Sequence, residues 1–193
     1  MSTEKAIKNI AEDFLSDSRD FLKRFKILLE PSLYSPIGMR SKLLVDLLFS
    51  AECCIKALIL RDSNTSTLEN FFSHDLTKLL PLLSETDYSF CVSHLDGNFI
   101  TFSVENRYMM ETHKIFRTNQ TLNETYYNTI ANFQWFTEVP ENIQKMIDYA
   151  SSKIDVPIRA VKISEIDLEE NKMITEYKTN FKKQVKKRKK GRK

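Results

Sequence analysis

One amphipathic segment constrains the fold of this chain more than any other feature. From residue 37 to residue 61, apolar side chains recur at positions i, i+3, i+4 and i+7 without a break, which is the spacing of one helix face. Such a stripe predicts a helix that packs against other helices. We expect the following side chains of the stripe to be buried: Leu44, Leu47, Leu48, Ala51, Ile55 and Leu58.

Composition favours helices in the rest of the chain as well. Only 3 Gly and 5 Pro occur among 193 residues, too few to punctuate the many short strands of a β-sandwich. We therefore predict an all-α fold, a bundle of about five or six helices. The expected helices span residues 3–29, 37–61, 67–83, 122–136 and 140–153, with a short one near Tyr108. A loop is expected over residues 30–36, irregular chain over residues 84–100 and an extended stretch from Phe99 to Val104.

The charges divide the chain into two parts. Residues 178–193 contain ten Lys and Arg and no acid, while the rest has 19 basic and 26 acidic residues, a net charge of −7. We predict a helical domain over residues 1–155 and an extended or disordered basic tail over residues 156–193. Such a tail suits a polyanion, either a nucleic acid or an anionic membrane surface, and we expect RNA. The nucleic-acid-binding residues would be Lys182, Lys183, Lys186, Lys187, Arg188, Lys189, Lys190 and Arg192.

Several familiar kinds of site have no counterpart in the sequence. It contains no Gly-rich phosphate loop, no GxSxG and no HExxH motif, and its three His are far apart, so we expect neither a metal site nor a cofactor. Three Cys without CxxC spacing indicate a reducing compartment such as the cytoplasm. The basic run at residues 186–189 would also serve nuclear import in a eukaryotic host. Charges interrupt the longest apolar stretch, from Leu43 to Leu60, so we expect no membrane span.

Four local features carry candidate chemistry. They are Glu52 with Lys56 on an apolar helix, His74 with Asp75 on the next helix, Arg107 followed by Tyr108, and the spacing of Arg107 to His113. Glu52 and Lys56 can bridge on one helix face, and a surface or half-buried ion pair is the alternative to a functional role. His74 can either touch a ligand or hydrogen-bond locally and hold two helices together. Trp135 is expected in the core rather than on a base-stacking platform.

These features resemble, in their order and spacing, the HEPN superfamily, small helical bundles found in nucleotidyltransferase partners, defence systems and ribonucleases. The segment from Ala51 to Leu58 is similar to the family's A-E-x-x-(apolar)-K-A helix. The segment from Ser73 to Leu80 is similar to its H-(D/S)-L-x-x-L helix, and residues 105–108 to its R-Y step. The resemblance covers residues 38–153.

The resemblance implies metal-independent RNA cleavage at a dimer interface, in a defence or toxin-type system. HEPN ribonucleases carry an Arg, four to six residues and then a His, and Arg107 and His113 fit that count. His113 would move a proton between the 2′-hydroxyl and the leaving oxygen, and Arg107 would stabilise charge on the phosphate. The supporting residues would be Glu52, Lys56, His74, Asp75 and Tyr108.

Two departures keep a second interpretation open. Many nuclease members have a small polar residue after the Arg, whereas Tyr108 stands here, as in members that accompany a nucleotidyltransferase. Residues six apart on one helix also point about 120° apart, so Arg107 must precede the helix or a second chain must complete the site. The resemblance, together with this spacing, therefore implies a homodimer. The alternative is a non-catalytic helical module that binds a nucleotidyltransferase or another nucleic-acid-binding protein, and the acidic body favours it. An antitoxin would be another partner of a toxin-type protein.

Overall fold

A computed structural model of the chain describes residues 3–33, 38–62, 71–102 and 120–154. This part contains seven α-helices, one 3-10 helix and no strand, so the predicted all-α class is confirmed there. The helices are α1 (Thr3–Leu33), α2 (Gly38–Asp62), α3 (Leu76–Leu79), α4 (Glu85–His94), α5 (Gly97–Thr101), α7 (Gln120–Asn128) and α8 (Phe133–Lys153), and the 3-10 helix η1 spans Leu80–Leu82.

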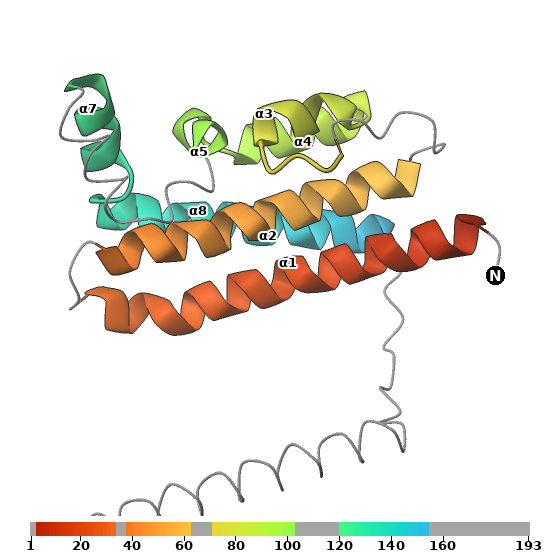
Figure 1. Cartoon of the computed structure of the whole chain (residues 1–193), viewed down its shortest axis with the longest axis horizontal. Helices are drawn as coiled ribbons and strands as arrows, with labels where there is room; N and C mark the ends of the chain where they lie inside the picture. Colours follow the sequence, from red (N-terminus) through yellow and green to blue (C-terminus); the bar gives the residue numbers. More distant parts are fainter. Residues whose placement is uncertain (1–2, 34–37, 63–70, 103–119, 155–193) are drawn as a thin grey trace, which may run out of the picture. The chain divides into compact units, whose positions relative to one another are not determined.

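The central element is α2, against which α1, α3 and α8 pack (Figure 1). All six stripe residues that the sequence predicts as core are buried, each at most 4% exposed. Burial is not confined to that stripe, because every residue from Leu43 to Leu60 except Phe49 is buried. A helix buried on all sides must pair any charge that it carries, since an unpaired buried charge is strongly unfavourable.

The two long helices α1 and α2 run antiparallel (Figure 1) and meet at a pair of small residues. The Ser18 hydroxyl donates to the Ser50 carbonyl oxygen at 2.7 Å, and the Ser50 hydroxyl donates to the Ser18 carbonyl oxygen at 2.8 Å. Nearer the start of α2, the Arg24 guanidinium pairs with the buried carboxylate of Asp46. Polar contacts thus satisfy groups that this interface removes from water.

The first helix is longer than predicted. It continues to Leu33 and passes through Pro31, whereas a loop was expected from residue 30. Near the other end of the domain, α8 begins at Phe133 and passes through Pro140, which was expected to start a helix. The Asn132 side chain caps α8 by accepting from the backbone N–H of Gln134 at 3.0 Å. The predicted helix over residues 122–136 is therefore divided between α7 and α8.

The segment between α2 and α7 differs most from the prediction. Residues 71–75 are not helical, and α3 begins only after Asp75, so the expected helix over residues 67–83 is wrong in this part. The stretch expected to be irregular contains α4, capped by Ser84, and α5, capped by Asp96. Because α5 includes Phe99, the predicted extended stretch is wrong at its start. The expected helix near Tyr108 and the expected domain boundary lie outside the described residues.

Candidate functional site

Glu52 and Lys56 form an ion pair inside the protein. The Lys56 Nζ donates to Glu52 Oε1 at 2.7 Å, as their spacing of one helical turn predicts. The two residues are only 4% and 5% exposed, so the expectation of a surface or half-buried pair is wrong. The pair is buried because other parts of the fold cover the face of α2 that carries it. The ammonium lies 5.5 Å from the centre of the Phe71 ring and 5.9 Å from that of Phe14, which gives it favourable aromatic contacts.

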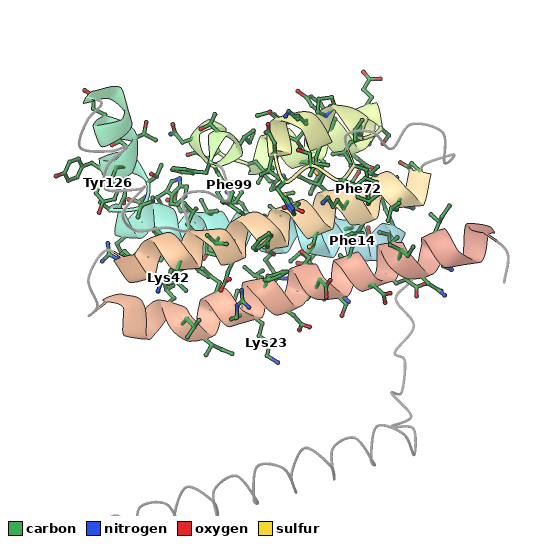
Figure 2. All side chains as sticks on the ribbon, in the orientation of Figure 1. Phe14, Lys23, Lys42, Phe72, Phe99 and Tyr126 are labelled. Atoms are coloured by element: carbon green, nitrogen blue, oxygen red, sulfur yellow. The ribbon has the colours of Figure 1, made fainter. Side chains whose placement is uncertain are left out.

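Figure 2 labels the two aromatic residues that flank this region, Phe14 on α1 and Phe72 in the segment before α3. The Phe71 ring contacts both, with ring centroids 5.8 Å from Phe14 and 5.6 Å from Phe72. Phe71 is buried and Phe72 is 77% exposed. The rings of Phe14 and Phe71 therefore cover the ion pair on the side of the protein core. Phe72, the residue after Phe71, is exposed to solvent.

His74 brings a third functional group to the pair. Its Nδ1 lies 3.0 Å from Glu52 Oε1 and 3.1 Å from Glu52 Oε2, although the two residues are 22 positions apart. The edge of the ring meets Phe49 at a centroid distance of 6.1 Å. The His74 side chain is 58% exposed, whereas that of Glu52 is 6% exposed. The imidazole thus connects a buried carboxylate to the surface.

The contact with Glu52 determines which ring nitrogen of neutral His74 carries the proton. An ionised carboxylate only accepts hydrogen bonds, so Nδ1 must be the donor. Nε2, the ring nitrogen directed away from Glu52, then has the lone pair that can accept a proton. The arrangement can orient an imidazole for proton transfer, and it can equally hold the segment before α3 against α2.

Asp75 has a local role next to this cluster. Its Oδ1 accepts from the backbone N–H of Thr77 at 3.0 Å and from the Thr77 hydroxyl at 2.6 Å, which caps α3. These hydrogen bonds from Thr77 lower the pKa of Asp75, and Lys78 adds to the effect. The carboxylate is therefore engaged with its own helix, so the structure explains Asp75 as a cap.

The other predicted site residues lie outside the described residues. These are Arg107, Tyr108, His113 and the basic residues of the tail, Lys182, Lys183, Lys186, Lys187, Arg188, Lys189, Lys190 and Arg192. The structure accordingly brings together Glu52, Lys56 and His74, and the predicted roles of the remaining residues stay predictions.

A second ionic cluster was missed by the sequence reasoning. Asp87 on α4 is 0% exposed and accepts from Arg61 at 2.8 Å, from the Tyr149 hydroxyl at 2.7 Å and from Lys153 at 2.6 Å. Burial alone would raise the pKa of Asp87, but the bonds from Lys153 and Tyr149 and the nearby charges outweigh it and lower the pKa. The residues that meet here come from α2, α4 and α8. The cap pattern Ser84-x-x-Asp87 was the available signal for a helix at this place.

Aromatic stacking extends this second cluster toward the surface. The Phe90 ring stacks on Tyr149 at 3.9 Å and on His94 at 4.3 Å between ring centroids. The Nδ1 of His94 lies 2.9 Å from the Phe90 carbonyl oxygen and 3.0 Å from the Ser93 hydroxyl. His94 therefore has hydrogen-bond partners at Nδ1, as His74 does, but they are a carbonyl and a hydroxyl oxygen rather than a carboxylate.

The three thiols are buried and unpaired by disulfides. Burial raises the pKa of Cys53 and of Cys91 to about 12, and it raises the pKa of Cys54 as well. Since the thiolate is the reactive form, these side chains are poor nucleophiles. Within residues 3–33, 38–62, 71–102 and 120–154, no group of three or more His, Cys, Asp or Glu side chains is placed to hold a metal ion.

The chain matches no family model, no curated protein and no solved structure. No helix in the described part of the chain is both long enough and apolar enough to span a membrane.

Proposed function

We propose that this protein is a HEPN-like protein that acts on RNA, as a metal-independent endoribonuclease of a defence or toxin-type system. The observation that carries the proposal is the meeting of Glu52 and Lys56 with His74 at hydrogen-bond distance. Two segments that resemble HEPN helices thus contribute to one polar cluster. This contact supports the interpretation that the two motifs belong to one structural unit and are not two chance similarities.

Metal-independent cleavage of RNA needs few protein groups. RNA supplies its own nucleophile, the 2′-hydroxyl, so the protein must move protons and stabilise the charge of the phosphate. Imidazole titrates near neutral pH and guanidinium offers a fixed fork to phosphate oxygens, which fits His113 and Arg107. The raised pKa values of the buried thiols argue against cysteine as an alternative nucleophile.

The tail and a second copy of the chain complete the proposal. Ten Lys and Arg in residues 178–193 would bind the RNA backbone through counterion release, without sequence preference. A homodimer would let Arg107 and His113 of two chains surround one phosphate, because their spacing disfavours one helix face.

A non-catalytic module that binds a nucleotidyltransferase or another protein is the second candidate. Two observations favour it. The residues outside 178–193 have a net charge of −7, and the Glu52 carboxylate already has partners within the protein. A surface that cleaves RNA should be locally positive, and a polar cluster with internal partners can serve packing alone.

One experiment separates the two candidates. Purified protein is incubated with total RNA in EDTA, beside a variant with both Arg107→Ala and His113→Ala. The nuclease proposal expects cleavage by the wild type only, with products that end in 2′,3′-cyclic phosphate. Activity that EDTA abolishes contradicts the metal-independent mechanism. Absence of cleavage by the wild type on any RNA favours the interaction module.

A further inference from the structure

Two aromatic side chains are exposed on either side of the turn between α7 and α8. This turn lies at the end of the bundle where α1 ends and α2 begins (Figure 1). Tyr127, near the end of α7, is 65% exposed, and Phe133, the first residue of α8, is 51% exposed. Trp135 and Phe136 in the first turn of α8 are buried. Packing in the core therefore accounts for the latter pair but not for the two exposed rings.

The turn that carries these rings is held in place. The backbone N–H of Ala131 donates to the Tyr126 carbonyl oxygen at 3.0 Å, which keeps the end of α7 next to the start of α8. Ile130, in the middle of the turn, is fully buried and anchors it in the core. The ring of Tyr126, labelled on α7 in Figure 2, meets the Tyr127 ring at a centroid distance of 5.5 Å. A ligand that binds the exposed rings therefore meets a preorganised surface, which lowers the entropic cost of binding.

A cation lies beside the same turn. The Arg40 guanidinium donates from Nη1 to the Ala131 carbonyl oxygen at 3.4 Å. Burial raises the pKa of Tyr126, and the positive charge of Arg40 opposes that rise, as expected for a cation close to the ring. Exposed aromatic rings next to a guanidinium suit a ligand that has both planar rings and negative charge. Single-stranded nucleic acids are bound in this way, with bases stacked on aromatic side chains and cations near the backbone.

We propose that Tyr127 and Phe133 form a binding site for unpaired bases of RNA, with Arg40 beside them to attract the phosphate backbone. The inference rests on the proposed action on RNA and adds a binding site to it. In duplex RNA the bases are stacked on one another and cannot meet these rings, so the site selects single-stranded segments. The basic residues of the tail would supply affinity for the phosphates of either form.

The test measures binding of three labelled RNA probes to the full chain by fluorescence anisotropy. The probes are a single strand, the same strand paired with its complement, and a strand of equal length without bases. All carry 2′-O-methyl groups, so they lack the hydroxyl that the proposed cleavage needs and stay intact. Tyr127→Ala and Phe133→Ala should each weaken binding of the single strand about 5- to 150-fold, the usual effect of losing one stacked base. Binding of the duplex and of the strand without bases should stay as in the wild type.

Matched variants show whether the rings themselves are responsible. Tyr88→Ala removes another exposed tyrosine, on α4, and should bind all three probes as the wild type does. Tyr127→Phe and Phe133→Tyr keep an aromatic ring and should retain binding of the single strand. Glu124→Gln removes an exposed carboxylate one helical turn before Tyr127, and it should strengthen binding because the ligand is an anion. Circular dichroism melts ensure that affinities are compared between folded proteins.

The outcomes separate this inference from the proposed function. If the wild type binds none of the probes, the proposed action on RNA fails and the inference fails with it. If the wild type binds RNA and both alanine variants bind the single strand equally tightly, only the site at Tyr127 and Phe133 is overturned. Equal losses on all three probes also overturn it, because the rings would then not contact bases. If light scattering shows that the alanine variants lose a dimer while their RNA binding is unchanged, the turn is a contact between proteins and the site is likewise overturned.

Discussion

Removal of the Asp87 carboxylate should destabilise this fold substantially. The side chain is fully buried and binds the cationic groups of Arg61 and Lys153 together with the Tyr149 hydroxyl. Breaking a buried pair by removing one partner costs about 3–5 kcal/mol. The two cations are partly exposed, with 23% and 28% of their side chains accessible, so they can regain water when the carboxylate is lost. We therefore expect the lower end of this range, about 3 kcal/mol, for Asp87→Ala.

Urea unfolding measures this loss directly. The chain has one Trp, Trp135, which is buried and donates to Asp96 Oδ2 at 3.2 Å, so its fluorescence should report unfolding of the core. With a denaturant slope of about 2 kcal/mol/M, a loss of about 3 kcal/mol lowers the midpoint by about 1.5 M. Asp62→Ala is the matched control, because Asp62 is an exposed carboxylate that pairs with the same Arg61. The control should change stability by less than about 0.5 kcal/mol, and a similarly small change for Asp87→Ala would refute the reasoning.

The same cluster predicts a direction for the pH dependence. Burial by itself would raise the pKa of Asp87, but the bonds from Lys153 and Tyr149 and the charges of Arg61 and Lys153 place it below the ordinary value of 3.8. A carboxyl group whose pKa is depressed by folding stabilises the native state above its unfolded pKa and ceases to do so as pH falls through its folded pKa. Wild type should therefore lose stability as the pH falls below about 4, and Asp87→Asn should lose less over that interval.

The remaining predictions concern the core, the tail and the oligomeric state. Leu48→Ala should lower the free energy of unfolding by about 2–5 kcal/mol, because it leaves a cavity beside α2, and an unchanged urea midpoint would contradict the packing. Removal of residues 178–193 should leave the melting temperature unchanged but weaken RNA binding. The full chain should lose affinity steeply between about 50 and 200 mM salt in a filter-binding assay, and equal binding by the truncated form would exclude this role for the tail. Light scattering should give the mass of a homodimer, and a monomer at tens of micromolar would count against it.

The sequence predicted the central helix because its period is local information. Apolar residues at i, i+3, i+4 and i+7 specify a helix and one buried face, and both were found in α2. The pattern could not reveal that the other faces are buried too, because the partner of Asp46 and the second partner of Glu52 come from other segments. Arg24 lies 22 residues before Asp46, and His74 lies 22 residues after Glu52. Such pairs form only when the tertiary structure brings the segments together.

The helices α4 and α5 were missed for a different reason. They have 10 and 5 residues, too few for an apolar period to stand out from the background. Their caps were visible, since Ser84 and Asp96 each precede one of these helices and accept a backbone N–H from it. Cap residues also occur in loops, so they mark a helix start only when packing behind them is known. Pro140 was expected to start a helix, but it lies inside α8. Burial of Val139, Ile143 and Ile147 outweighs the loss of the backbone hydrogen bond that proline cannot donate.

Burial of the ion pair between Glu52 and Lys56 on α2 costs more free energy than burial of apolar side chains at the same positions would. Replacing a buried pair with apolar side chains of similar volume is often neutral or stabilising, because two charges lose their water on burial. Glu52 and Lys56 occupy such positions on the most buried helix, between the rings of Phe14 and Phe71 and the imidazole of His74. An apolar pair would pack at least as well, but it could not accept a hydrogen bond from His74. The contact with His74 gives the charge of Glu52 a purpose that an apolar residue cannot replace, because it joins the segment before α3 to α2.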